Sequence, residues 1–411
     1  MTSQTSSLTS ESPALPQALV LLFALCCGAI VANLYYAQPI IELIAPDVGL
    51  SAERASLIVS LTQIGYALGL LFLVPLADLL ESRRLMLITT AAALLCLLAA
   101  AFANQPDLFL GLALLIGLSS VSVQMLIPLA ANLAPEASRG RVVGNIMSGL
   151  LLGILLARPL ASLIAGEFGW RAVYLMAAAL MLVITLVIAT TIPRHTPNHK
   201  ASYGQLLASL VNLLRRYPTL RRRALYQGLM FASFSLFWTV APLELSRHLG
   251  LSQQDIALFA LAGAIGAVAA PIAGRLADAG HTWRASLVAL ILAPLAFAPN
   301  LLSAGLGWIG LIVTAIVLDF AVQMSMVLGQ RSIYALEPQS RARLNALYMT
   351  SIFVGGAIGS ALASPVYERF GWSGTALLAA GLPLLALLVF IGKEKLGVGA
   401  NTKIAGNKKP A

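Results

Sequence analysis

Apolar residues fill long, nearly uninterrupted stretches of this chain, and polar residues gather in the short segments between them. A helix of about 18 or more apolar residues is long enough to cross a hydrocarbon layer ~30 Å thick. Because such stretches recur from end to end, the pattern predicts an all-α membrane protein with twelve transmembrane helices. The predicted spans are residues 17–40, 54–76, 85–103, 107–133, 142–165, 171–192, 225–245, 255–276, 286–302, 307–334, 344–365 and 373–392.

Four short strings occur twice in this chain, in the same order and 200 to 202 residues apart. They are Gly-Leu-Ser at 49 and 250, Leu-Ala-Asp at 76 and 276, Ser-Arg-x-Arg at 138 and 340, and Phe-Gly-Trp at 168 and 370. A repeat of this length in an apolar chain indicates two fused membrane halves of six helices each. Paired halves that enclose a central site are typical of transporters.

The composition agrees with a membrane protein, and the distribution of charge predicts its orientation. The chain is 59% hydrophobic and 10% charged, whereas a soluble domain has roughly 25% charged residues. With the N-terminus in the cytoplasm, 21 of the 26 Lys and Arg residues lie in cytoplasmic loops and the tail, four lie in the opposite loops, and Arg158 lies in a span. This bias predicts that both termini are cytoplasmic. The net charge of +10 therefore indicates contact with anionic membrane lipids and no nucleic-acid partner.

The chain divides into two bundles and three connecting or terminal segments. We expect six-helix bundles over residues 17–192 and 223–392, a disordered cytoplasmic segment over 1–16 and a basic cytoplasmic tail over 393–411. Residues 1–16 contain no Lys or Arg, so the first span is expected to be a permanent helix and not a signal peptide. In the central cytoplasmic loop, 193–222, leucines at helical spacing predict either a short amphipathic helix on the membrane surface or a partly ordered linker.

The sequence contains no pattern typical of a bound metal or cofactor. Cys26, Cys27 and Cys96 all lie in predicted spans and show neither metal-ligand nor disulfide spacing. The phosphate-binding pattern G-x-x-x-x-G-K-[ST] is absent, so ATP is not the expected energy source. No span presents paired carboxylates or a Ser–His set, and we therefore expect a protein that is not an enzyme, with no cofactor.

Two loops carry a motif that resembles the major facilitator superfamily (MFS). That family's loop between helices 2 and 3 reads G-x-L-A-D-R-x-G-R-[RK], with a weaker copy between helices 8 and 9. Residues 274–278, Gly-Arg-Leu-Ala-Asp, follow its first five positions. The first copy keeps Leu-Ala-Asp at 76–78, but Val74 replaces the Gly, and Arg83-Arg84 comes one residue late. The resemblance extends from the first predicted span to the last and implies the MFS fold.

Two further strings bear on the branch of that family. Gly149 and Gly153 match the start of the helix-5 motif of drug antiporters, G-x-x-x-G-P-x-x-G-G, but Ile154 replaces its Pro and Arg158 stands in place of a Gly. The string at 33–39, Asn-Leu-Tyr-Tyr-Ala-Gln-Pro, resembles the start of a bacterial efflux-permease branch. The string at 33–39 implies export but no particular substrate, and the departures in the fifth span argue against a multidrug antiporter.

The duplicated Leu-Ala-Asp loops predict a cytoplasmic gate. Asp78 would pair with Arg139 or Arg141, and breaking that pair would let the halves separate on the cytoplasmic side. The alternative is that these charges only anchor helix ends at the headgroups. The predicted gate residues are Asp78, Arg83, Arg84, Arg139, Arg141, Gly274, Asp278, Arg341 and Arg343.

Charged residues within the spans are the leading candidates for function. Asp319 lies near the middle of the tenth span, where an apolar environment disfavours the ionised carboxyl and marks an ion or substrate pathway. Arg158 lies inside the fifth span and would tune Asp319 or bind an anionic substrate. The alternatives are a hydrogen bond between helices for Asp319, and structural pairing or snorkelling for Arg158.

The resemblance implies that helices 1, 4, 7 and 10 line a substrate cavity. Polar and aromatic residues on these helices and on helix 2 are candidates for its wall, although buried amides and tyrosines also serve as hydrogen bonds between helices. The candidates are Asn33, Tyr36, Gln63, Tyr66, Gln124, Trp238 and Gln323.

The leading functional hypothesis is a monomeric secondary active transporter in a bacterial inner membrane. It would export a small organic solute, such as a drug, sugar or metabolite, in exchange for protons as its two halves rock. Proton-coupled uptake of an organic anion is the closest competitor, supported by Arg158. A non-transporting receptor or scaffold is a different class, and it would tolerate neutralisation of Asp319 and Arg158.

Overall fold

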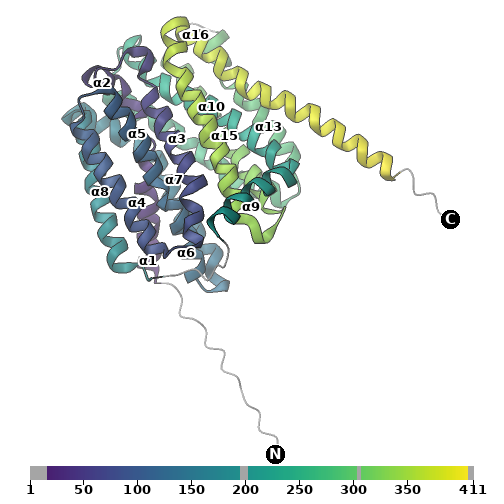
Figure 1. Ribbon diagram of the computed structural model, residues 1–411. Helices are drawn as coiled ribbons and strands as arrows, with labels where there is room; N and C mark the ends of the chain where they lie inside the picture. Colours follow the sequence, from purple (N-terminus) through teal and green to yellow (C-terminus); the bar gives the residue numbers. More distant parts are fainter. Residues whose placement is uncertain (1–15, 195–201, 303–306, 406–411) are drawn as a thin grey trace, which may run out of the picture.

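The computed structural model describes residues 16–194, 202–302 and 307–405, and describes side chains up to residue 392. The described chain is helical and contains no strand. Figure 1 shows the N-terminal helices, purple to blue, beside the C-terminal helices, green to yellow. The predicted disordered segment 1–16 lies outside the described residues except for its last residue, as do residues 406–411 of the predicted tail.

We call residues 17–191 the N half and residues 218–392 the C half. The helices of the N half are α1 (Gln17–Ala32), α2 (Ile41–Asp47), α3 (Leu57–Phe72), α4 (Ser82–Phe102), α5 (Pro106–Ser119), α6 (Val123–Leu133), α7 (Arg139–Phe168) and α8 (Trp170–Thr191). Helix α9 (Tyr203–Arg216) connects the halves. The helices of the C half are α10 (Pro218–Arg247), α11 (Gln253–Ala262), α12 (Ala269–Asp278), α13 (Thr282–Leu295), α14 (Ala298–Leu302), α15 (Gly307–Tyr334) and α16 (Arg341–Ala405).

Ten helical stretches of the described chain are long and apolar enough to cross a membrane. One of them, Pro338–Gly392, is 55 residues long and contains a non-helical residue, Gly371, with φ 63°, where two helices meet end to end. Helix α1 is apolar but shorter, at 16 residues. This arrangement is consistent with twelve membrane crossings, and that number stays a prediction.

Three predicted spans are interrupted near the middle of the bundle. The first was expected to be continuous over 17–40, but α1 ends at Ala32 and the chain continues through tight turns into the 3₁₀ turn Gln38–Ile40. Helices α5 and α6 are joined by the 3₁₀ turn Ser120–Ser122, and α11 and α12 by Gly263–Val268. Turns with i→i+3 bonds are tighter than α-helix and change the direction in which side chains point.

The N half is held together by close contact between α1 and α7. A Cβ added at Gly153 would lie 2.2 Å from the carbonyl oxygen of Gly28, and one at Gly149 would lie 2.5 Å from that of Ala24. Only glycine allows this approach, which is the small-residue packing typical of membrane helices. On the outer surface large apolar side chains are exposed, among them Leu95, Phe102 and Leu377, as expected of a surface in contact with lipid.

Helix α9 confirms that the central loop contains an amphipathic helix, but its apolar face packs on protein. Ser202 and Gln205 form a capping box at its start. Leu206, Leu210 and Leu213 are buried, and Tyr203 donates a hydrogen bond to the carbonyl of Phe72 in the N half at 2.9 Å. We use "α9 end" for the end of the bundle at this helix and "α2 end" for the opposite end, where α2 lies in Figure 1.

Candidate functional site

A cavity of ≈ 970 Å³ lies between the two halves. Its mouth is at the α9 end, where Asn132 and Arg341 are exposed and where Leu206 and Leu210 of α9 form part of the wall. Its deep end is lined by Tyr35, Phe234, Gly263 and the two charged residues Arg158 and Asp319. The fold therefore places both predicted charged residues in the wall of one cavity, Arg158 from the N half and Asp319 from the C half.

Arg158 is held on α7 among aromatic rings and one amide. Its side chain is 5% exposed, and its Nε donates a hydrogen bond to Oε1 of Gln38 at 2.7 Å. Its guanidinium carbon lies 4.5 Å from the ring centroid of Trp238, 5.0 Å from that of Tyr35 and 5.2 Å from that of Phe234. Cation–π attraction to three rings compensates part of the cost of burying a charge.

Asp319 lies in the middle of α15 against Trp238. The indole Nε1 of Trp238 donates a hydrogen bond to Oδ1 of Asp319 at 2.8 Å. Two glycines also lie against Asp319: a Cβ at Gly263 would lie 2.6 Å from Oδ2 of Asp319, and one at Gly266 would lie 2.5 Å from its Cβ. The break between α11 and α12 thus provides the space for this carboxylate, and any larger residue there would displace it.

The predicted cavity residues divide into two groups. Tyr66, Gln124 and Gln323 line the cavity, and Gln124 donates to the hydroxyl of Tyr66 at 3.2 Å. The other four lie outside its lining, in contacts between helices. Asn33 contacts Ser120 at 3.4 Å, Gln63 donates to Ser235 of the C half at 2.9 Å, Trp238 contacts Asp319, and Tyr36 is 4% exposed.

The predicted gate residues all lie at the α9 end, and three of them, Asp78, Arg341 and Arg343, line the cavity. Asp278 pairs with Arg331, which also donates to the carbonyl of Gly274 at 3.1 Å. Four predicted gate arginines donate hydrogen bonds to the backbone or to a nearby side chain: Arg83 to the carbonyl of Ala189, Arg139 to that of Ala131, Arg341 to that of Tyr334, and Arg343 to the hydroxyl of Ser340. Their role as a gate stays a prediction.

The same end carries a carboxylate outside the spans with a perturbed pKa. Glu337 accepts hydrogen bonds from Ser340 and from Tyr217, the latter at 2.8 Å. Hydrogen bonds to the ionised form hold the pKa of Glu337 below its usual range. Glu337 and Tyr217 fix the start of α10 to the loop before α16, so this contact lies on the C-half side of the cavity mouth.

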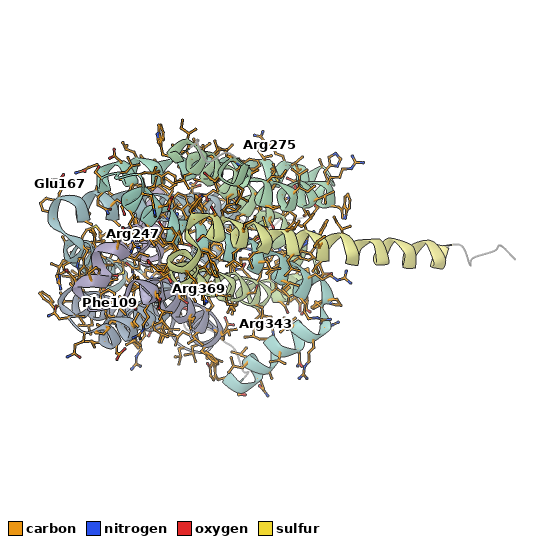
Figure 2. The ribbon with its side chains drawn as sticks, turned by 90° about the horizontal axis from the view of Figure 1, so that it is seen from above. Phe109, Glu167, Arg247, Arg275, Arg343 and Arg369 are labelled. Carbon is orange, nitrogen blue, oxygen red and sulfur yellow. The ribbon has the colours of Figure 1, made fainter. Side chains whose placement is uncertain are left out.

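The α2 end is closed by polar contacts between the halves. Arg247, at the end of α10, pairs with Glu42 of the N half and with Glu368 of its own half, the latter at 2.6 Å. Ser246 also donates to Glu42. In Figure 2, which views the molecule from above, Arg247 is labelled between the purple N-terminal helices and the green C-terminal ones.

Below this ion pair, α3 and α16 meet in a buried polar seam. The backbone N–H of Ser56 donates to Oγ of Ser364 at 3.1 Å, and the N–H of Ser364 donates to Oγ of Ser56 at 3.2 Å. The hydroxyl of Ser60 donates to the carbonyl of Ala357 at 2.7 Å. All of these serines are 2% exposed or less, so the halves are in direct contact here and water is excluded.

Sequence reasoning did not find Gln38, Arg247, Glu42 or Arg331 as site residues. Gln38 is the last polar residue of the Asn33–Pro39 string, and its position inside an apolar span was a usable signal. The Arg247–Glu42 pair joins residues 205 apart in the chain, and no local pattern relates them.

A helical bundle in two halves, with a central cavity open at one end and sealed at the other, has the form of a solute transporter. The Major Facilitator Superfamily profile matches residues 21–310 and 223–410. The chain is 43% identical over 394 residues to the uncharacterized transporter YgaY of Escherichia coli O157:H7, covering 93% of this chain and 97% of that one. It is 33% identical over 365 residues to a probable transporter of Streptomyces coelicolor, covering 87% and 83%. The protein belongs to the Major Facilitator Superfamily and is a multi-pass membrane transporter, not an enzyme.

Solved structures share the fold at low sequence identity. The nucleoside transporter NupG superposes with a TM-score of 0.73 at 14% identity, covering 91% of this chain and 98% of that one. The D-xylose–proton symporter gives 0.72 at 14% identity, covering 91% and 96%. These similarities confirm the predicted fold family; they carry no information on the solute.

Proposed function

We propose that the protein is a secondary active transporter that couples the movement of a small organic solute to protons carried by Asp319. The observation that carries this proposal is the position of Asp319. Its carboxylate lies in the middle of a membrane helix and in the wall of a cavity that opens at one end only. A carboxylate at such a depth is costly to bury, and ionisable residues inside membranes mark proton or substrate pathways. Alternate exposure to the two sides would let Asp319 load and release a proton.

Alternating access follows from the contrast between the two ends. The halves touch at the α2 end through Arg247 and the Ser56–Ser364 seam, and they separate around the cavity at the α9 end. The excess of Lys and Arg at the α9 end favours an orientation in a bacterial inner membrane with this end facing the cytoplasm; in that orientation this conformation is the cytoplasm-facing one. We expect the transporter to work as a monomer, because the cavity is formed within a single chain.

Export in exchange for protons is the first candidate mode, based on the resemblance to efflux permeases. In this mode the solute and the proton compete for Asp319, so the solute leaves as the proton binds. The second candidate is cotransport of an organic anion with protons, and the observation that favours it is Arg158 at the deep end of the cavity. In that mode the solute and the proton bind together.

The test uses purified protein reconstituted in proteoliposomes with an imposed pH gradient and a panel of radiolabelled organic acids, amines and sugars. Wild-type protein should accumulate one of these solutes uphill. Asp319→Asn should lose uphill transport and keep exchange of labelled for unlabelled solute, because exchange needs no net proton movement. The matched control is Asp107→Asn, whose side chain is 90% exposed, and it should behave as wild type.

Uphill transport by Asp319→Asn at the wild-type rate would remove proton coupling from this residue. The direction of proton movement separates the two modes. When solute flows out of the vesicles down its own gradient, protons that move in indicate exchange, and protons that move out with the solute indicate cotransport.

A further inference from the structure

The guanidinium of Arg158 has donor capacity that the protein does not use. Its Nε is bonded to Gln38, but its Nη2 is buried and has no hydrogen-bond partner among the described residues. The amide nitrogen of Gln38 is likewise buried and unpartnered in this part of the chain. Because the oxygen of Gln38 accepts from Arg158, its nitrogen is the free donor. Of the two side chains, Arg158 lines the cavity, so its charged N–H groups are the donors that a solute can reach, and a buried donor without an acceptor is destabilising.

The surroundings of Arg158 fit a flat apolar body attached to the missing acceptor. The rings of Tyr35, Phe234 and Trp238 lie 5.0, 5.2 and 4.5 Å from the guanidinium carbon. Tyr35 and Phe234 also line the cavity. A guanidinium presents its N–H groups as a fork that matches the two oxygens of a carboxylate. A cationic solute would instead be repelled by Arg158 at the deep end.

The formal charge of the cavity wall favours an anion as well. Its described lining contains three arginines, Arg158, Arg341 and Arg343, and two carboxylates, Asp78 and Asp319. Like charges in a cleft with apolar walls focus the field and concentrate the opposite charge there. Three positive and two negative groups give the wall a net charge of +1, which rises to +2 when Asp319 is protonated, and the arginines lie both at the mouth and at the deep end.

Trp238 connects the arginine to the proton site. Its indole ring contacts Arg158 and its N–H contacts Asp319, whereas Arg158 forms no ion pair within the described residues. The groups that face Asp319 are Arg158 from α7, Trp238 from α10 and Tyr35 from the turns after α1; from the break between α11 and α12, Gly263 and Gly266 lie against it and carry no charge. An ionised Asp319 therefore offsets the charge of Arg158, and a protonated Asp319 leaves that charge available.

We infer that the transported solute is an organic anion with a flat apolar body, whose acidic group binds Arg158, positioned by Gln38, when Asp319 is protonated. This inference rests on the proposed function, since it assigns the solute of the same cavity. Reciprocal linkage requires that protonation strengthens anion binding by the same factor as anion binding strengthens protonation. The proton and the anion therefore cross the membrane together, and the direction follows the larger gradient.

Binding to full-length protein in lipid nanodiscs tests the inference without a transport assay. Isothermal titration compares benzoate, 2-naphthoate and indole-3-acetate with their uncharged amides, at one acidic and one alkaline pH. At least one acid should bind while its amide does not, and more tightly at the acidic pH. Arg158→Gln should weaken that binding roughly 10- to 100-fold, the equivalent of one lost charged hydrogen-bonded contact. Asp319→Asn should bind the acid equally at both pH values.

Gln38→Glu supplies a second variant that does not remove the buried charge. Its carboxylate would occupy the free donors of Arg158, so we expect a higher melting temperature together with loss of acid binding. A purely structural role for Gln38 would change stability without affecting the acids. The matched control is Arg284→Gln, an exposed arginine outside the cavity lining, which should bind as wild type.

The inference is overturned when no acid binds better than its amide, or when both Arg158→Gln and Gln38→Glu bind the acid as wild type does. Failure of the proposed function looks different. Acids that bind as expected but move no protons in proteoliposomes leave the anion site standing and remove proton coupling. Transport of an amine or sugar driven by the pH gradient would keep proton coupling and remove the anion site.

Discussion

The two ends of the bundle use the same kinds of residue in opposite ways. At the α2 end charged and hydroxyl side chains join the halves to each other, as in the contacts of Glu42 with Arg247 and Ser246. At the α9 end, Asp278 pairs with Arg331 of its own half, and Arg216 of the connecting helix α9 pairs with Glu337 of the C half. The ends differ in the partners of their charged side chains. At the α2 end a charge pairs across the two halves, and this is the end at which the halves touch.

The comparison also explains why closing one end opens the other. The contacts at the α2 end are individually modest, because the side chains of Glu42 and Arg247 are 26% and 34% exposed, and exposed ion pairs contribute little. The buried Ser56–Ser364 seam requires the backbones of α3 and α16 to touch. From this contact the halves diverge toward the α9 end, where the cavity opens.

The largest expected effect comes from fixing the closed end covalently. Ser56→Cys with Ser364→Cys places two thiols where the present side chains already contact each other's backbone, within reach of a disulfide. Oxidation should abolish transport, because the α2 end can no longer open, and a reducing agent should restore it. The native cysteines are removed in the background, and each single substitution is the control. Transport that continues through the oxidised protein would show that the seam does not need to separate.

A moderate effect is expected from the cross-half ion pair. Glu42→Gln removes a carboxylate that Arg247 reaches across the halves, and Glu368→Gln removes one that it reaches within the C half. The first should raise the population open at the α2 end by roughly fivefold, the equivalent of about 1 kcal/mol, and the second should leave it unchanged. Reaction of Ser364→Cys with a maleimide reports the opening rate. Equal rates in the two variants would assign Arg247 to local anchoring.

The smallest effect concerns a contact at the α2 end that stays within the N half. Asp47 accepts hydrogen bonds from Trp170 at 2.9 Å and from Arg171 at 2.7 Å, and these hold its pKa below the usual range. A lowered pKa stabilises the folded state above the unfolded pKa of about 3.9, and this contribution is lost as the pH falls through the folded value.

Asp47→Asn should therefore lower the melting temperature slightly at neutral pH, by the equivalent of less than about 1 kcal/mol after solvent screening. The difference from wild type should vanish in strong acid. Thermal melts across a pH series measure it, and maleimide access to Ser364→Cys should not change. A change in that access would mean that Asp47 takes part in closing the α2 end after all.

Much of the fold could be predicted from the sequence, because it depends on local and repeated patterns. Long apolar stretches and the 200-residue repeat are visible without knowing any contact, and they led to the family that the comparisons show. Asp319 and Arg158 stood out because charge is rare inside spans. That both residues lie in the wall of one cavity depends on how α7 packs against the C half, which the sequence does not show.

The rest of the candidate site depends on pairs of residues that lie far apart in the chain and that no local sequence pattern relates. The partner of Arg158 is Gln38, 120 residues earlier, and the space for Asp319 comes from Gly263 and Gly266 in the turn between α11 and α12. Trp238 was expected in the cavity wall, and the structure has it behind that wall, between the two charged groups. The interruption after Ala32 changed which residues of the first span face inward, because a tight turn does not preserve helical spacing.

Those interruptions have a mechanical consequence. The turns after α1, the turn between α5 and α6, and the turn between α11 and α12 each replace α-helical backbone bonds by shorter-range ones in the interior of the bundle. A helix interrupted in this way is stiff on both sides of the break and compliant at it, and 3₁₀ stretches within helices often mark hinges. Amide hydrogens should exchange faster at these joints than in α7 or α15, which are continuous over 30 and 28 residues. Each half therefore consists of stiff segments with compliant joints between them, and the joints after α1 and between α11 and α12 lie beside Arg158 and Asp319.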